Sequence, residues 1–337
     1  MTTSRRPFAA ALCGILLVAA AAPASAVVFK IATDAPDGSL WVSSLRSVAE
    51  QVAEHTEGRV TFKFYPGGVM GDDKAVMRKI RSGQLHGAVM TVGGLTRTYT
   101  DIQLYNMPMA FRSLDEVDHV RAHMDNTLLE GLEERGFVSF GIAEVGFAYA
   151  MSQEPIATLD EVRAQKVWVP DGDEGAARSL ESFGIAPIPL SIADVLGGLQ
   201  TGLIDAVTVP PVAAIVLQWH TQLDHVLDLP LLYIYGTLAV SKRQFDKISG
   251  ADQAHLRRVM GELVREVNQQ NRRDHERAVA VLEEQGLEWH AADPGVVVQW
   301  QDLADAASVE LVEADIVSGP LYEEMLRLLA AYRATLD

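Results

Sequence analysis

The chemistry that could first be sought in this sequence is metal binding by histidine. His220 and His225 lie five residues apart, whereas two zinc ligands on one face of a helix lie four apart. The spacing therefore predicts no metal site at this pair. Six other histidines are interpreted as surface or helix-capping residues: His86, His119, His123, His255, His275 and His290.

An acidic run at residues 171–175 resembles part of a calcium loop, with Asp171 and Asp173 as ligands. An EF-hand loop needs ligands at positions one, three and five and a glutamate at position twelve, and this run supplies only the first two. The pattern favours a polar turn that leads into a helix, because acidic side chains stabilise a first helical turn. Asp72 and Asp73 are likewise interpreted as a helix start, not as a catalytic dyad.

Motifs for nucleotide binding and nucleophilic catalysis are missing from the sequence. It contains neither a phosphate loop ending in Lys-Ser/Thr, nor a dinucleotide-binding glycine pattern, nor a Gly-x-Ser-x-Gly elbow. The single cysteine, Cys13, lies near the N-terminus, so the rest of the chain can form no disulfide and no cysteine-based site. We therefore expect no enzyme, no cofactor and no metal.

The composition is that of a folded, acidic protein. Hydrophobic residues make up 48% of the 337 residues, which excludes a disordered chain because ample apolar surface can be buried. The 28 Lys+Arg and 45 Asp+Glu give a net charge of −17. Nucleic-acid binding is excluded because phosphate contacts need a basic face. The length predicts two compact lobes of roughly 150 residues each.

Residues 1–26 have the pattern of a signal peptide. Arg5 and Arg6 precede an apolar run at 8–22, and Ala24 and Ala26 flank a small-residue cleavage site. The run is shorter than the roughly 20 residues of a membrane span. We predict export to the periplasm with cleavage near Ala26. The two arginines also fit a twin-arginine signal, so the export route stays open.

The remaining sequence alternates short apolar runs with amphipathic stretches, which predicts an α/β fold with helices on both faces of a sheet. The first elements are strands at 28–33, 60–65 and 87–92, with helices between them. Capping boxes that begin at Ser113, Thr158 and Ser191 each predict a helix start.

A helical pattern of 35 residues at 251–285 would extend about 50 Å, so we expect it to contact both lobes. Its middle, residues 268–277, is almost wholly polar and is interpreted as a solvated helix face; a coiled-coil role is the alternative. No linker separates the lobes, so the chain is expected to cross between them within strands.

Several segments, taken in order, resemble the solute-binding subunit of tripartite ATP-independent periplasmic (TRAP) transporters, the DctP-type receptors. The segments cover nearly the whole mature chain, and the last is the most specific. They lie at residues 56–60, 65–71, 78–83, 87–90, 106–112, 166–170, 184–189 and 199–205.

This resemblance implies a two-lobe periplasmic-binding-protein fold, type II-like, with hinge strands and a long lobe-spanning helix. The expected lobes are 27–147 with about 233–265, and 148–232 with about 266–337. The implied function is capture of a small solute in the cleft between the lobes and delivery to membrane permease subunits. The implied receptor is not inserted in the membrane.

The sequence departs from the family pattern at the pocket. The arginine that clamps a ligand carboxylate in most such receptors corresponds to Trp168, and a second family arginine corresponds to Ala148. The family's asparagine and the preceding glutamate correspond to Val209 and Thr208, and an aromatic wall position to Ile192. The predicted solute is therefore apolar, aromatic or lipid-like. The remaining predicted ligand-binding residues are Phe147, Tyr149, Asp171, Trp41 and Thr91.

Three alternatives stay open at this point. A relocated arginine, Arg97 or Arg178, could clamp a carboxylate. Asp171 and Asp173 could bind a cationic head group that stacks on Trp168. The protein could also be a periplasmic scaffold or sensor partner that has lost solute binding. A cleft filled by its own side chains would favour this last alternative, and a deep tunnel would favour the apolar solute.

Overall fold

A computed structural model describes residues 26–336, so the predicted signal peptide lies outside the described residues except for Ala26. The first part of the chain alternates strands and helices, as the sequence predicts. Its elements are β1 (Val27–Thr33), α1 (Leu40–His55), β2 (Val60–Tyr65), α2 (Asp73–Arg81), β3 (Gly87–Thr91), the short 3-10 helices η1 (Val92–Leu95) and η2 (Thr100–Asn106), α3 (Leu114–Glu134) and β4 (Phe137–Ser139).

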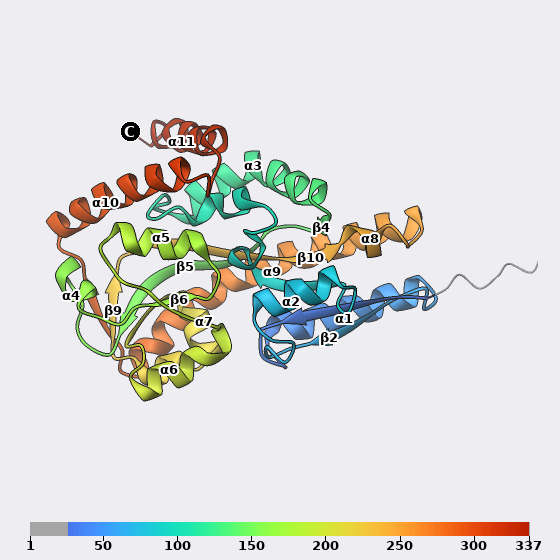
Figure 1. The fold of residues 1–337 in the computed structure, drawn as a ribbon, viewed down its shortest axis with the longest axis horizontal. Coiled ribbons are helices and arrows are strands. Elements are labelled where there is room, and N and C mark those ends of the chain that lie inside the picture. The colour runs from blue at the N-terminus through green and yellow to red at the C-terminus, as the bar shows by residue number, and fades with distance from the viewer. Residues whose placement is uncertain (1–25, 337) are drawn as a thin grey trace, which may run out of the picture.

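The second part contains shorter elements followed by three longer helices (Figure 1). In order these are β5 (Ala143–Ser152), α4 (Leu159–Arg163), β6 (Trp168–Pro170), α5 (Glu174–Ser182), β7 (Ile188–Leu190), η3 (Ile192–Asp194), α6 (Val195–Thr201), β8 (Ala206–Val209), α7 (Pro211–Val216), η4 (Trp219–Gln222), β9 (His225–Asp228), β10 (Leu232–Ser241), α8 (Lys242–Phe245), α9 (Gly250–Glu284), β11 (Glu288–Ala291), α10 (Pro294–Glu313) and α11 (Gly319–Arg333).

One mixed sheet runs through the molecule in the order β11-β9-β5-β10-β3-β1-β2, with β8 paired to β5 and β4 to β10. The pairs β1–β2, β1–β3 and β9–β11 are parallel, whereas β10 pairs antiparallel with both β3 and β5. The predicted α/β class is therefore confirmed. A separate small sheet joins β6 and β7 in parallel.

The two longest strands, β5 and β10, connect the two halves of the sheet. The register of their antiparallel pair shifts between Ile234 and Tyr235, which indicates a bulge. A bulge bends and twists a strand locally. Both connections between the halves of the sheet thus lie within continuous strands, in line with the expectation that no separate linker exists.

Helix starts follow the capping pattern in two of three predicted places. Thr158 and Glu161 form the full reciprocal capping box of α4, and the Ser113 hydroxyl accepts a hydrogen bond from the Glu116 amide at the start of α3. Ser191 does not cap α6, because its hydroxyl donates to the Asp194 carboxylate and the short η3 turn intervenes. The prediction at Ser191 is therefore displaced by one turn.

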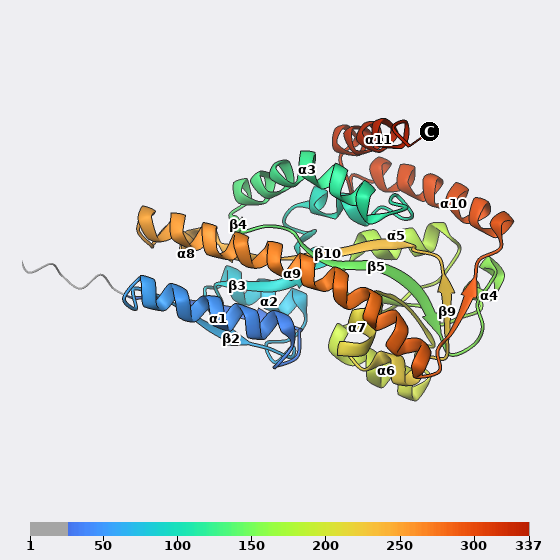
Figure 2. The same cartoon turned by 180° about the vertical axis from the view of Figure 1, so that it is seen from behind.

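The predicted long helix is α9, whose 35 residues begin and end within one residue of the predicted limits. In Figure 2 it runs diagonally across the front of the sheet, from the end near α1 to the end near α6 and α7. Leu256 and Leu263 pack in a core with α1 and β1, whereas Leu282 packs in a second core with α6 and β8. One helix therefore joins two separate hydrophobic cores.

The polar middle of α9 differs from the predicted solvated face. The Asn268 side chain accepts a hydrogen bond from the Glu144 amide and donates one to the Ile142 carbonyl, and Asn271 donates to the Glu144 carbonyl. Asn271 is only 7% exposed. The prediction of a solvated face is wrong for these two asparagines, because they bind the backbone at residues 142–144. It holds for the outer side of the same stretch, where four residues are exposed: Gln269, Arg273, Glu276 and Arg277.

The C-terminal helices pack on different parts of the molecule. Trp300 and Ala304 of α10 lie in a core with α4 and α5, whereas Met325 and Leu328 of α11 lie in the core that contains α3. Figure 1 shows α11 beside α10 and above α3. The predicted lobe limits, which assign 266–337 to one lobe, stay a proposal.

Candidate functional site

A cavity of about 230 Å³ lies between the crossing strands and the elements of the second part of the chain. The lining comes from strands β5, β6, β8 and β10 and from helices α5, α7 and α10, and the first part of the chain adds Thr91 of β3 together with residues of η1 and η2. Most of the lining is apolar, and it extends inward to Phe183, Trp300 and Val317. A cavity of about 150 Å³ with apolar walls can hold benzene, so this one has room for a larger molecule.

Five of the predicted ligand-binding residues line this cavity: Thr91, Trp168, Ile192, Thr208 and Val209. Trp168 lies on β6, is 8% exposed, and donates a hydrogen bond from its indole nitrogen to the Leu190 carbonyl at 3.0 Å. Its ring meets the edge of Trp219 with centroids 5.0 Å apart. The backbone partner fixes the indole, so that an immobile aromatic surface forms part of the wall.

The other predicted residues lie outside the lining. Ala148 is fully buried and pairs with Leu232, Phe147 packs edge-on against Tyr233, and Tyr149 packs edge-on against Trp289. These side chains lie on β5, where neighbouring residues alternate between sheet faces. The last two are Trp41, which packs beside the core of α1 and β1, and Asp171, which binds Lys74.

Asp173 is the most buried acid of the cavity wall. Its carboxylate caps α5 by accepting from the Ala176 amide at 3.0 Å, and it accepts from the Gln103 side chain at 2.7 Å. Burial raises the pKa of Asp173 above its usual value. Gly93 lies so close to the Asp173 carboxylate that no Cβ would fit there. The site thus holds a carboxyl group with only neutral partners.

The acidic 171–175 segment connects the end of β6 to elements of the first part of the chain. Asp171 pairs with Lys74 of α2 at 2.8 Å, and Glu174 lies 3.5 Å from Arg97. Gly175 leaves no room for a Cβ beside Gln103. The predicted polar turn into a helix is confirmed, since Asp173 caps α5 and Glu174 lies in its first turn.

Two more acids, Asp34 and Asp73, line a small cavity of about 10 Å³ beside α2 and β3, enough for about one water molecule. Burial raises the pKa of Asp34 to about 6 and that of Asp73 to about 7, and the negative charges nearby add to both shifts. Asp73 is influenced by Asp34 and Asp173. Carboxyl groups that change charge near neutral pH therefore lie next to the main cavity.

Positive charge is missing from the cavity wall. Among the described residues that line the cavity there is no Lys, Arg or His. Neither proposed substitute arginine is a lining residue: Arg97 lies near Glu174, and Arg178 is an exposed residue of α5. The polar lining consists of neutral and acidic groups: Thr91, Gln103, Asn106, Asp173, Ser179 and Thr208.

Gln103, Asn106 and Trp300 are lining residues that the sequence interpretation missed. Asn106 lies in the 106–112 segment that resembles the family, which was an available signal. The Asn106 side-chain oxygen is buried and has no hydrogen-bond partner among the described residues. Gln103 and Trp300 carried no local signal, because their place in the wall depends on the packing of η2 and α10.

Within residues 26–336, no helix combines the length and the apolar character that a membrane span requires.

Relatives of known name were found by sequence. The chain is 22% identical over 288 residues to the C4-dicarboxylate-binding periplasmic protein DctP of Rhodobacter capsulatus, covering 84% of each chain. It is 22% identical over 196 residues to the sialic acid-binding periplasmic protein SiaP of Vibrio cholerae, covering 57% of this chain and 60% of that protein. For several curated relatives the match spans only about half of their length.

Solved structures share the fold. A TRAP periplasmic solute binding protein from Xanthobacter autotrophicus Py2, with bound β-D-galacturonate, superposes with a TM-score of 0.81 at 19% identity. The superposition covers 90% of this chain and 99% of the other. The predicted two-lobe fold is therefore confirmed.

The family itself is decided by the match to DctP, the bacterial extracellular solute-binding proteins of family 7, over residues 31–315. This match spans most of the chain and agrees with the family resemblance seen in the sequence. Its members are binding proteins, which confirms the expectation that the chain is not an enzyme. The chain belongs to the DctP family of extracellular solute-binding proteins.

Proposed function

We propose that this chain is the periplasmic receptor of a TRAP transporter, which captures a small solute between its lobes and delivers it to membrane permease subunits. Family membership and the 230 Å³ cavity support this role. The scaffold or sensor alternative would require a cleft filled by side chains, so the cavity favours a receptor. The signal-peptide pattern at residues 1–26 supports the periplasmic location.

The relatives favour a small organic acid as the solute. SiaP is named for sialic acid, DctP for C4-dicarboxylates, and the Xanthobacter structure contains galacturonate. All three ligands carry carboxylates. The apolar, aromatic or lipid-like solute predicted from Trp168 and Ala148 gains no support from these relatives. The alternative of a carboxylate-binding receptor is better supported, although neither Arg97 nor Arg178 lines the cavity.

The single observation that carries our choice of acid is the cavity wall, which is largely apolar and contains no cationic side chain. A small dianion would lose its hydration there without gaining a positive partner, which is unfavourable. We infer that the solute is a monocarboxylic acid with a sizeable apolar body. The body would pack against Trp168 and Val209, where each buried Å² contributes about 25 cal/mol.

Neutral groups would bind the carboxyl end of this solute. The unpartnered Asn106 oxygen can accept a hydrogen bond from a hydroxyl or a protonated carboxyl group. A protonated Asp173, favoured by its raised pKa, can donate one to a carboxylate. The cationic head group considered for Asp171 is less favoured, since Lys74 already occupies that carboxylate.

Contacts of the 171–175 segment would hold the receptor closed around its solute. In the proposed division into lobes, Lys74, Arg97 and Gln103 belong to one lobe and their partners to the other. The three contacts surround the cavity wall at Asp173. They support a closure in which polar pairs form between lobes while the solute fills the cavity.

The test is calorimetric titration of the mature protein with a panel of acids. The panel contains aromatic and branched aliphatic monocarboxylates, sugar acids and C4-dicarboxylates, each with its neutral amide. We expect the apolar monocarboxylates to bind at micromolar Kd and the C4-dicarboxylates to bind at least about tenfold more weakly. A preference for dicarboxylates would overturn the choice of acid, and no binding by any member would overturn the receptor role.

A matched pair of variants sharpens this test. Trp168→Arg restores a guanidinium to the wall and should improve C4-dicarboxylate binding by about tenfold or more, because hydrogen bonds to charged groups contribute about 1.5–3 kcal/mol. Trp41→Ala is the control, since Trp41 is not a lining residue. It should leave all affinities unchanged while circular dichroism reports intact folding.

A further inference from the structure

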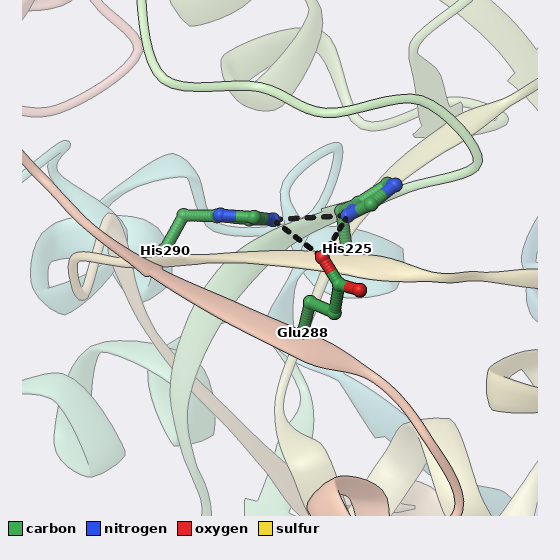
Figure 3. Close-up of side chains that lie close together, drawn as sticks. All are labelled: His225, Glu288 and His290. Atoms are coloured by element: carbon green, nitrogen blue, oxygen red, sulfur yellow. Dashed lines mark hydrogen bonds and ion pairs between the residues drawn. The ribbon is translucent and has the colours of Figure 1, made fainter.

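A histidine pair and a glutamate meet at the edge of the sheet, away from the cavity wall. His225 lies on β9, and Glu288 and His290 lie on the parallel edge strand β11 (Figure 3). The register pairs His225 with Glu288, and His290 follows two residues later. Because side chains two residues apart point to the same face of a strand, all three project from one face.

The ligand atoms of this cluster, called here the 225/288/290 cluster, are close together. His225 Nδ1 lies 2.9 Å from His290 Nε2, and the Glu288 Oε2 oxygen lies 3.7 Å from the former and 3.9 Å from the latter. A tetrahedral zinc ion with bonds of about 2.0–2.1 Å places its ligand atoms about 3.3 Å apart. Each of these distances lies within roughly 0.6 Å of that value, which side-chain rotation can supply.

Exposure of the cluster suits an ion that enters from solvent. The side chains of His225 and His290 are 16% and 32% exposed, and that of Glu288 is 69% exposed. The backbone is firmly held, because the strands pair through four residues and the Glu288 amide donates to the Asp224 carbonyl at 2.8 Å. A rigid backbone with an accessible opening leaves a coordination position for water.

Hydrogen bonding alone explains only part of this arrangement. Two neutral imidazoles can share one N–H···N bond at 2.9 Å, and this would account for the histidines. It does not account for Glu288, whose oxygen is beyond hydrogen-bonding distance of both rings. Two imidazole nitrogens and one carboxylate oxygen are instead a ligand set that suits zinc and its neighbours among the divalent transition metals.

We propose that His225, Glu288 and His290 bind one divalent transition-metal cation of the zinc type, with water completing the coordination. None of the three residues lines the solute cavity. The bound ion would join edge strand β11 to β9, and with β11 it would hold the segment between the end of α9 and the start of α10. No motif spacing predicts this site, because its two histidines lie 65 residues apart in the chain.

The experiment is metal titration of the full mature chain, with any affinity tag removed and metal stripped by a chelator. Calorimetry with Zn²⁺ and visible absorption with Co²⁺ measure the stoichiometry and the ligand environment. We expect one site of micromolar or tighter Kd. His225→Ala and His290→Ala should each weaken it by about 100-fold or more, and Glu288→Gln by about tenfold. Zn²⁺ should raise the Tm of the parent protein, and it should raise the Tm of His225→Ala and His290→Ala by less.

The control is the double variant His119→Ala, His123→Ala, because these residues form another close pair on α3, with ring centroids 4.9 Å apart. Full-strength binding in this variant supports the 225/288/290 cluster, whereas loss of binding there overturns it. A parent protein that binds no tighter than millimolar also overturns the proposal. His290→Gln repeats the test with a milder change if an alanine variant fails to fold.

Acid supplies a second readout. Protons compete with a metal ion for imidazole nitrogens, so Zn²⁺ affinity should be lower in acid than at neutral pH. Zinc affinity that does not change on acidification would contradict ligation by two histidines.

Discussion

Two buried carboxylates in this molecule are held in opposite ways. Glu144 on β5, 1% exposed, accepts hydrogen bonds from two nitrogens of the Arg272 guanidinium, Nε at 3.0 and 3.2 Å and Nη2 at 2.8 Å, and one from the Tyr233 hydroxyl at 2.9 Å. Asp173 at the cavity wall has only neutral donors, Gln103 and the Ala176 amide. One acid thus has a cation within hydrogen-bonding distance, and the other does not.

This comparison distinguishes a buried acid that stabilises the fold from a buried acid that lies at a binding site. A buried acid that has a cation and full hydrogen bonding fixes the packing around it. A buried acid without a cation keeps a raised pKa, and such groups concentrate at binding sites. By this criterion α9 is joined to β5 by a structural ion pair, whereas Asp173 and its neighbours Asp34 and Asp73 remain able to change charge.

The largest expected effect comes from breaking the structural pair. Glu144→Ala leaves Arg272 partly buried with only Asp118 as a partner and should lower the free energy of unfolding by about 3–5 kcal/mol. Urea denaturation followed by circular dichroism measures this loss. The matched control, Asp118→Ala, removes the exposed partner of the same arginine and should lower it by less than about 1 kcal/mol. Equal losses would contradict the distinction.

An intermediate effect is expected from the acids with raised pKa. Burial favours the protonated form of Asp73 in the folded state, so the free energy of unfolding is higher at low pH. This contribution of Asp73 is lost as the pH rises from about 4 to about 7. Asp73→Asn should therefore nearly match the parent protein near pH 4 and exceed its free energy of unfolding by about 3–4 kcal/mol at pH 8. Denaturation at several pH values measures the difference.

The control for this pH dependence is Asp302→Asn, which changes an exposed acid of α10. It should leave the pH profile of stability unchanged. A profile of Asp73→Asn that runs parallel to that of the parent would show that burial of Asp73 does not set the slope.

The smallest effect is expected at the partly exposed pair of the 171–175 segment. Lys74 and Asp171 are about one-third exposed, and pairs of this kind contribute less than about 1 kcal/mol. Lys74→Met should lower stability by roughly 0.5 kcal/mol, and 1 M salt should remove the difference because exposed charges are screened. Arg46→Met, at an exposed pair on α1, is the control. A loss of several kcal/mol for Lys74→Met would show that this pair stabilises the fold as strongly as the buried pair of Glu144 and Arg272.

The helix pattern made the limits of α9 predictable but not its environment. A row of Asn and Arg has the same appearance whether it contacts water or the backbone of a strand, and only the docking of α9 on β5 distinguishes the two. Trp168 was identified through its place in the family pattern, and it does line the cavity. The neighbours 147–149 do not, because Phe147 and Tyr149 pack against Tyr233 and Trp289 and Ala148 is fully buried.

Long-range register explains what the sequence could not indicate. The 225/288/290 cluster exists because β11 pairs with β9 in one particular alignment. A shift by one residue would send Glu288 and His290 to the opposite face. The cavity wall has the same origin, because Gln103 and Trp300 meet there from distant parts of the chain.

Because α9 is one continuous helix, a rotation at its middle is transmitted to both of its ends. The helix is 35 residues long, or about 52 Å, and it is anchored near its centre where Asn268, Asn271 and Arg272 bind β5. A helix that is held at its middle can rotate about that point without a change in length. One degree of rotation there moves each end by about 0.5 Å. A bend of a few degrees at the crossing strands is thus enough to make or break contacts the length of a hydrogen bond at the far ends of the molecule.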